Sequence, residues 1–417
     1  MNQLFLSLIR VSIGNSDSLS RIPSAEEWTE LYAMAAKQAV IGICFAGVNY
    51  LYHSEGSDAI DWNKTHGSEN LPEELYFEWA GHAMSIQSRN EDMDKLCATV
   101  CRTFNRDGMP SLILKGQGVA KVYEDKRLDH RFSPLALNKS YLSSLRQSGD
   151  IDVWVMPVDA IEDGKVIMPL KERRKRMSEY CRKALPKYDP TKEGYMHTSF
   201  PCFSSTEVEV HFTPTSLSSP RANRRLQKWL EEQWSEQLEN RNTDGDFYSP
   251  SLQFNLVYLL LHIYKHTLFE GIGYRQIIDY YFVLQNSTKS DREYAYDILK
   301  SFGAHKFAAA LMWVIKEGLM DGQEARDKGK ELPNVFGIDP LTSRLICPAD
   351  SKRGRLLMNM IIEGGNFGHY SKHVINSENN TLWRHVKRYV VRNTQLIGYY
   401  PDEVLWHLVR KLFLVAE

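Results

Sequence analysis

Two carboxylates lie two residues apart in the otherwise apolar segment 149–157, GDIDVWVMP. Successive side chains of an extended strand point to opposite faces, so Asp150 and Asp152 share one face and the apolar residues share the other. Paired carboxylates at the mouth of a buried strand cost solvation free energy unless a cation lies between them. Because Mg²⁺ is the usual hard divalent ion in such places, the segment predicts a metal site.

A second acidic pattern occupies 207–212, where polar and apolar residues alternate as EVEVHF. Glu207, Glu209 and His211 therefore share one face of a predicted strand, and the valines face a core. If the two strands are neighbours, a glutamate joins Asp150 and Asp152 around the same metal or metals. This ligand set is typical of two-metal nucleotidyl or phosphoryl transfer. Alternation alone does not separate Glu207 from Glu209.

A glycine-containing turn precedes these strands, in SLILKGQGVAKVYE at 111–124. The pattern predicts a short buried strand at 112–114, a tight turn at Gly116 and Gly118, and a helix through Tyr123. Such a turn offers backbone N–H groups to phosphate oxygens at a helix N-terminus. Lys115 and Arg146 either neutralise a triphosphate there or form surface ion pairs.

Helical patterns flank these motifs on both sides. Before them, residues 24–52 and 72–104 have apolar residues at helix spacing, with Ser24 as N-cap and Asp107 and Gly108 as the stop. Beyond Pro214 the helical pattern returns, with Ser249 and Pro250 as a cap and first-turn pair. The middle adds a basic helical segment at 171–183 and strand-like runs at 195–203 and 207–212, joined by Ser204 and Ser205.

The order of the motifs carries a resemblance. LKGQGVAKVYE, then R..GDIDVWV with Arg146, then VEVH, then H...H followed by YRQIID resembles the uncharacterised nucleotidyltransferase family of the polymerase-beta-like superfamily, over 111–284. The resemblance implies that the glycine turn holds a triphosphate and that a DxD pair and a third carboxylate bind Mg²⁺, or Mn²⁺ as the alternative ion. The E.H spacing favours Glu209 over Glu207. The implied catalytic and metal-binding residues are Asp150, Asp152 and Glu209, and the implied nucleotide-binding residues are Lys115, Gly116, Gln117, Gly118 and Arg146.

The chain departs from the superfamily pattern in two places. Gln117 follows Gly116 where the superfamily usually has Gly or Ser, and a long insertion separates Tyr123 from Arg146. The fold class implied is α+β, with a small mixed-sheet nucleotidyltransferase-like core between helical regions. The expected domains are a helical N-terminal region at 1–107, the core at 108–215 and a helical C-terminal domain at 216–417.

Composition limits the class of protein. A hydrophobic content of 43% suffices for sizeable cores, and 51 basic against 52 acidic residues leave no global field for nucleic acid or anionic membrane. The six cysteines form no CxxC pair, and Cys97 and Cys101 fit a buried helix face. Without a signal-peptide pattern or a membrane-length apolar run, the sequence predicts a soluble, cytoplasmic protein with no membrane partner.

Histidines and basic runs have competing interpretations. His262 and His266 lie one helical turn apart, but no third ligand is evident, so a role facing the cleft or in helix packing is favoured over zinc. Arg275 and Asp279 are expected to form an ion pair behind them. His197 and His211 lie on a predicted hairpin, where one of them lines the cleft or both bond at a domain edge. The basic residues at 171–176 and 221–225 lack interleaved aromatics, so solvated helix faces are favoured over nucleic-acid binding.

The function expected from these features is Mg²⁺-dependent transfer of a nucleoside monophosphate from an NTP, such as ATP, to an unidentified acceptor, with release of pyrophosphate. Glu209 is the candidate proton acceptor. The alternative is a catalytically inactive nucleotide-binding or protein-interaction module on the same fold. A glycosyltransferase reading of the DxD ranks last, because the residues before it are mostly helical rather than an α/β nucleotide-binding unit.

Overall fold

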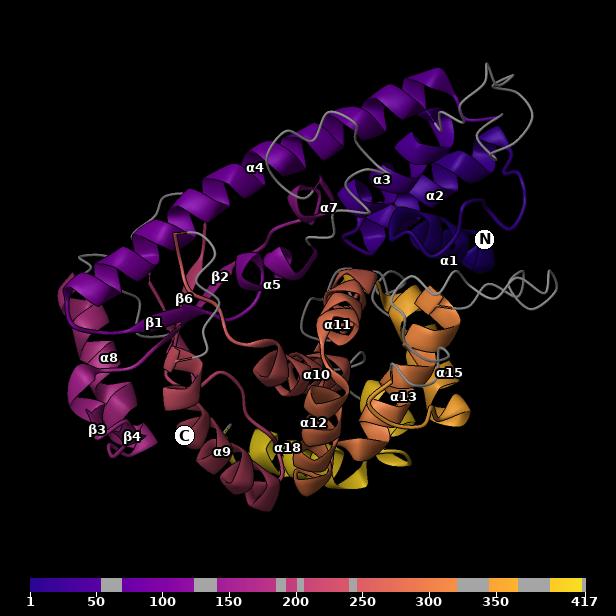
Figure 1. Ribbon diagram of the computed structural model, residues 1–417. Helices are drawn as coiled ribbons and strands as arrows, with labels where there is room; N and C mark the ends of the chain where they lie inside the picture. Colours follow the sequence, from indigo (N-terminus) through magenta and orange to yellow (C-terminus); the bar gives the residue numbers. More distant parts are fainter. Residues whose placement is uncertain are drawn as a thin grey trace.

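The structure is a computed structural model, and it describes residues 1–53, 70–123, 141–184, 193–200, 206–239, 246–320, 345–366 and 391–414. Most of the insertion between Tyr123 and Arg146, the polar break after residue 53 and the expected Ser204–Ser205 connection lie outside these residues. The α+β class is confirmed: a small mixed sheet lies between helices from both ends of the chain (Figure 1).

The N-terminal helices are α1 (Asn2–Ser12), α2 (Ala25–Lys37), α3 (Ile41–His53) and α4 (Glu73–Arg106). The predicted cap of α2 is confirmed, because Ser24 Oγ accepts from the Glu27 backbone and the Glu27 side chain accepts from the Ser24 backbone. The helical pattern at 24–52 is divided between α2 and α3 at Ala39, whose φ of 56° interrupts regular helix. Helix α4 ends where predicted, before Gly108 at φ 76°.

The sheet has the order β1-β2-β6-β5 within the described residues, with β1 (Ser111–Ile113), β2 (Ile151–Val155), β5 (His197–Ser199) and β6 (Val208–His211). Strands β2 and β6 are parallel, and each edge strand is antiparallel to its neighbour. The glycine turn leads from β1 into the short helix α5 (Gln117–Ala120) and the 3₁₀ turn η1 (Lys121–Tyr123). The remaining elements are α7 (Tyr141–Ser144), η2 (Val158–Ala160), the hairpin β3 (Ile161–Glu162) and β4 (Lys165–Val166), and the basic helix α8 (Leu170–Ala184).

The two faces of the sheet have different partners. On one face, Val153 and Val210 belong to an apolar cluster with residues of α4 and α8, including Cys97 and Cys101. This packing confirms the buried-face interpretation of those two cysteines. On the other face, Trp154 packs against helices from the C-terminal region, with ring centroids 4.6 Å from Trp234 and 5.7 Å from Phe254. The carboxylates therefore lie on the face that the C-terminal helices cover.

The C-terminal helices are α9 (Pro220–Glu239), α10 (Leu252–Phe269), α11 (Tyr274–Asn286), α12 (Lys289–Ser301), α13 (His305–Ile315), the π-turn η4 (Lys316–Met320), α15 (Ser351–Gly364) and α18 (Pro401–Leu414). Helix α9 begins at Pro220, within the region beyond Pro214 where the sequence predicts helix. The predicted cap of α10 is wrong by two residues: Ser251, not Ser249, accepts from the Phe254 backbone, and Pro250 precedes the cap.

Helices from the two ends of the chain share one apolar cluster. Arg10 of α1 donates from Nε to the Gly318 carbonyl, and the Phe5 and Tyr274 rings meet edge-on at 5.9 Å. Gln38 links α2 to both α11 and α15, because its amide accepts from the Tyr274 backbone and donates to Ile361. Among the described residues, no helix combines the length and apolarity that crossing a membrane requires.

Candidate active site

Three carboxylates converge on the sheet face that the C-terminal helices cover. Asp152 and Glu209 are direct neighbours in the parallel register of β2 and β6, and Asp150 immediately precedes β2. One carboxylate oxygen from each of Asp150, Asp152 and Glu209 lies within 4.8 Å of the others. This span meets the distance that a shared cation requires, since carboxylate oxygens lie about 2–2.5 Å from Mg²⁺ or Ca²⁺. Glu207 points elsewhere, toward the Ser199 hydroxyl at 3.2 Å.

Lys115 and His211 compensate the charge of these carboxylates. Lys115 Nζ lies 3.0 Å from Asp152 Oδ2 and 3.3 Å from Asp150 Oδ2. Burial lowers the pKa of Lys115, but the charges of Asp152 and Asp150 outweigh burial and raise it above its usual value. Burial likewise opposes the charged form of His211, whose hydrogen bonds to Asp152 and Glu209 nevertheless raise its pKa to about 9. Both side chains are therefore cationic at neutral pH.

The carboxylates offer ionised oxygen atoms, the ligands that a hard divalent ion prefers. Burial raises the pKa of Glu209, but the His211 hydrogen bond and charge reverse the effect and lower it to about 2. Burial also opposes ionisation of Asp152, but the charge of Lys115 and the hydrogen bond from His211 outweigh burial. The pKa of Asp152 is therefore lowered. Asp152 Oδ2 is buried, and its close partner is Lys115 Nζ at 3.0 Å. A divalent ion bound to this oxygen would take the place of the ammonium group as the compensating charge.

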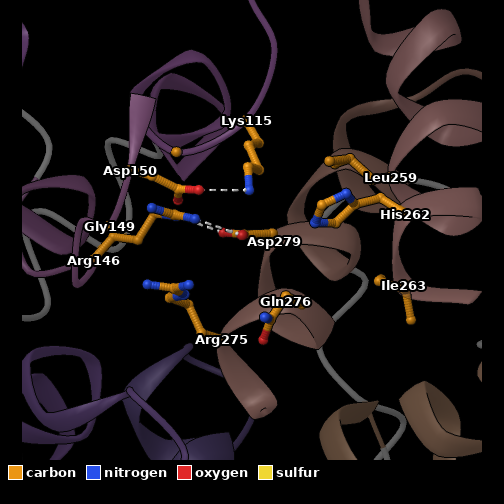
Figure 2. A pocket seen from close by; sticks show the side chains of 11 residues that line it. Lys115, Arg146, Gly149, Asp150, Leu259, His262, Ile263, Arg275, Gln276 and Asp279 are labelled. Carbon is orange, nitrogen blue, oxygen red and sulfur yellow. Dashed lines mark hydrogen bonds and ion pairs between the residues drawn. The ribbon is translucent and has the colours of Figure 1, made fainter. Parts of the chain in front are cut away.

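A pocket opens beside the carboxylates, between the residues that lead into β2 and the helices α10 and α11 (Figure 2). Lys115 and Asp150 lie on the sheet side, and Leu259, His262 and Ile263 come from α10. The other lining residues are Gly116, Arg146, Gly149, Arg275, Gln276 and Asp279. Asp150 belongs both to this pocket and to the carboxylate group, so a ligand in the pocket can reach the metal-binding oxygens.

Arg146 and Asp279 form a buried, two-pronged ion pair across the pocket. Arg146 Nε and Nη2 donate to the two Asp279 oxygens at 2.6 and 2.7 Å, and Tyr123 adds a hydroxyl hydrogen bond at 2.7 Å. The expected pair between Arg275 and Asp279 is therefore wrong: the partner of Asp279 lies 133 residues away along the chain. Arg146 lines the pocket as a residue already bound to a carboxylate.

Arg275 is the site residue for which sequence reasoning gave no ligand role. It is 8% exposed, and its Nη1 donates to the Gln147 carbonyl at 3.1 Å. Its Nε is buried without a hydrogen bond, and no ion pair of Arg275 occurs among the described residues. Burial and then the charge of Arg146 lower its pKa. Figure 2 shows its guanidinium facing Arg146 and Gly149 across the pocket.

The glycine turn contributes its first residue to the pocket and its later residues to packing. Gly116 lines the pocket at φ 62°, a conformation that favours glycine. A Cβ on Gly118 would lie 2.2 Å from the Ile113 carbonyl oxygen, so this glycine lets α5 approach β1. The Gln117 side chain points to α4, where its amide donates to Asp94 at 2.6 Å. Gln117 and Gly118 are not among the lining residues of the pocket.

The two histidines of α10 have different surroundings. His262 lines the pocket, as one of its two sequence interpretations expects, and burial followed by the nearby His266 lowers its pKa well below the usual value. His266 Nδ1 lies 2.7 Å from Glu270 at the helix end. Among the described residues, the pair does not belong to a group of three metal-ligating side chains.

The basic runs lie on helix faces outside the pocket. Arg221, Arg224 and Arg225 of α9 are exposed, as solvated faces require. Within 171–176, Arg173 is buried instead and donates to Glu231 at 3.0 Å, so it ties α8 to α9. None of these residues lines the pocket.

Comparison with known proteins identifies one family. Residues 139–319 match the model of a family described as an uncharacterised nucleotidyltransferase. The match includes the three carboxylates and the pocket residues of α10 and α11, and it begins after Lys115 and the glycine turn. No curated protein and no solved structure matches the chain at a significant level. The resemblance inferred from the motif order is confirmed over the matched residues, and the match supports a role in nucleotidyl transfer.

Proposed function

Since residues 139–319 match a nucleotidyltransferase family, we propose that the protein transfers a nucleoside monophosphate from an NTP to an acceptor and releases pyrophosphate. The observation that carries the proposal is the convergence of Asp150, Asp152 and Glu209 beside a pocket rich in cationic side chains. These carboxylates would hold Mg²⁺ or Mn²⁺, which when bound neutralises triphosphate charge and orients the reacting phosphate.

The protein's own cations would bind the triphosphate from both sides of the pocket. Lys115 lies next to Asp150 on the sheet side, and Arg275 projects from α11 on the opposite side. Arg275 is the stronger candidate because it is buried, forms no ion pair with any described residue and has an Nε–H without a hydrogen bond, and phosphate oxygens accept such hydrogen bonds in pairs. Arg146 would orient the segment before β2, since Asp279 already occupies its guanidinium.

The proton-acceptor role expected for Glu209 is weakened by its surroundings. A carboxylate whose pKa is held at about 2 by His211 is a poor base for an acceptor hydroxyl near neutral pH. We therefore assign Glu209 to metal binding alone. Asp150 is the carboxylate that faces both the pocket and the metal-binding group, so it is the one that an acceptor in the pocket would approach.

The test is a transfer assay on the purified chain with each of the four NTPs and Mg²⁺ or Mn²⁺, with pyrophosphate release and mass spectrometry of lysate acceptors as readouts. We expect Asp150→Asn and Glu209→Gln to lower the transfer rate by at least about 10²-fold, the size expected when one charge-stabilising group is lost. Glu207→Gln is the matched control, because Glu207 immediately precedes the same strand but lies outside the carboxylate group, and this variant should retain the rate. Full Mg²⁺-dependent transfer by Asp150→Asn would refute the proposal.

A second candidate function is a nucleotide-binding module without turnover. Lys115 already lies between Asp150 and Asp152, and this arrangement compensates both carboxylates without a metal. Isothermal titration together with the pyrophosphate assay separates the two candidates. A binding module would bind NTP with measurable heat and release no pyrophosphate with any acceptor.

A further inference from the structure

A second group of ligand atoms adjoins the three carboxylates on the same sheet face. His197 of β5 pairs directly with His211 of β6 in the antiparallel register, and Glu209 lies two residues before His211. Glu209 Oε2 lies 3.4 Å from His197 Nδ1 and 3.3 Å from His211 Nε2. One ligand atom from each of the three residues lies within 4.8 Å of the others.

The hydrogen bonds of the two histidines suit metal ligands. His211 Nδ1 lies 3.3 Å from the Thr213 carbonyl oxygen, which accepts a hydrogen bond from it, and Nε2 faces the carboxylates. An ion at Nε2 would replace the second proton of this cationic imidazole, and that proton would be released to solvent. Ligating histidines are usually oriented by such a bond from the other ring nitrogen. His197 Nδ1 is a buried atom with no hydrogen bond, although it faces Glu209. A nitrogen of this kind lacks a partner that an ion would supply.

We propose that His197, Glu209 and His211 form a second cation site, for a borderline divalent ion such as Zn²⁺. Two imidazole nitrogens and one carboxylate oxygen form a donor set that Zn²⁺ and neighbouring first-row ions bind readily. Mg²⁺ prefers oxygen ligands and suits the adjoining Asp150–Asp152–Glu209 group instead. The proposal does not depend on nucleotidyl transfer, and it gives the two groups one shared ligand, Glu209.

Sharing Glu209 has a consequence for the adjoining group. His211 Nε2 also contacts Asp152 Oδ1 at 2.8 Å, so a His211 that binds an ion gives up its hydrogen bond to Asp152. The ion at the second site then has both Glu209 and His211 as ligands. Zn²⁺ is therefore expected to weaken Mg²⁺ binding when both ions are present, because the two sites compete for the same carboxylate.

The test measures metal affinity directly on the full chain after chelator treatment. Zn²⁺ is titrated in competition with a chromophoric chelator, and Co²⁺ serves as a spectroscopic substitute whose visible absorption reports nitrogen ligands. His197→Ala and His197→Gln are expected to lower Zn²⁺ affinity by at least about 10²-fold and to remove the Co²⁺ spectrum of the site. Circular dichroism and thermal melts in chelator show that each variant is folded.

Three further variants locate the ion. His266→Ala should bind Zn²⁺ like the wild type, because His266 pairs with His262 on α10 and lies outside the proposed site. Asp150→Asn should retain Zn²⁺ and lose Mg²⁺·NTP, whereas Glu209→Gln should weaken both. Unchanged Zn²⁺ affinity in His197→Ala, loss of affinity in His266→Ala, or absence of competitive Zn²⁺ binding by the wild type would each overturn the proposal. A failed transfer assay would leave these titrations unaffected, so the two proposals fail separately.

Discussion

The sheet side and the helix side of the site both carry cations, but their surroundings act on them in opposite directions. On the sheet side, carboxylate partners raise the pKa of Lys115 and His211 despite burial. On the helix side, burial and neighbouring cations lower the pKa of His262 and Arg275. The pKa of Lys265 on α10 is lowered to about 8, with burial as the largest cause.

This difference shows on which side of the site a bound ligand would compensate the most buried charge. The sheet side compensates its own charge, because Lys115 and His211 contact all three carboxylates. The ion pair of Arg146 with Asp279 joins the two sides and compensates itself, whereas Arg275 on the helix side is buried and forms no ion pair within the part of the chain that the structure describes. An anion that enters the pocket would therefore relieve the helix side, and the phosphates of an NTP are such an anion.

The largest expected effect comes from breaking the compensated pair. Asp279→Asn leaves the Arg146 guanidinium buried without its carboxylate, and removal of one partner of a buried ion pair costs about 3–5 kcal/mol of unfolding free energy. Urea unfolding followed by circular dichroism measures the loss. The double variant Arg146→Met with Asp279→Leu should recover most of it, since no charge stays buried. A single variant as stable as wild type would contradict this account of the pair.

Arg275 should behave in the opposite way. Arg275→Met removes a buried charge that forms no ion pair with any described carboxylate, so we expect unfolding free energy to stay within about 1 kcal/mol of wild type or to rise. Affinity for Mg²⁺·NTP should fall roughly 10- to 100-fold, the value of one hydrogen bond to a charged group. Isothermal titration measures the affinity, and Arg275→Lys, which keeps the charge, should lie between the two. Wild-type affinity in Arg275→Met would remove Arg275 from the site.

The smallest effect concerns the pH dependence of stability. The folded-state pKa of Lys265 is about 8, below its ordinary value of 10.5. Between these values the unfolded chain binds a proton that the folded chain does not, so this residue makes stability rise with pH across that window. Thermal melts of wild type and Lys265→Met from pH 7 to 10.5 isolate the contribution as a difference. A difference that stays constant over this range would contradict the lowered pKa.

The sheet side could be predicted because strand alternation fixes which residues share a face. Asp150 and Asp152 on one strand and Glu209 on another needed only the assumption that the strands are neighbours, and the parallel register pairs Asp152 with Glu209. The preference for Glu209 over Glu207 came from the family resemblance rather than from alternation. The glycine turn, the ends of α4 and the cap of α2 were equally local signals.

The helix side could not be predicted, because its charge pairs join residues far apart in the chain. Helical spacing made Arg275 the apparent partner of Asp279, but a two-pronged bond from Arg146 across 133 positions prevailed. Because Arg146 occupies both oxygens of Asp279, Arg275 forms no ion pair among the described residues. The cap of α10 failed for a different reason, since Ser249, Pro250 and Ser251 offer competing starts within three positions.

Helix α4 connects the N-terminal helices to the sheet, the sheet packs on the C-terminal helices, and those helices pack back on α1 (Figure 1). The three parts thus contact one another in a ring, and the molecule does not consist of two lobes joined by a hinge. A rigid-body gape wide enough to admit a nucleotide would have to separate one of those interfaces and expose apolar surface. If the pocket binds an NTP as proposed, we therefore expect side chains and short segments at the rim of the pocket, rather than a rigid-body opening, to admit it.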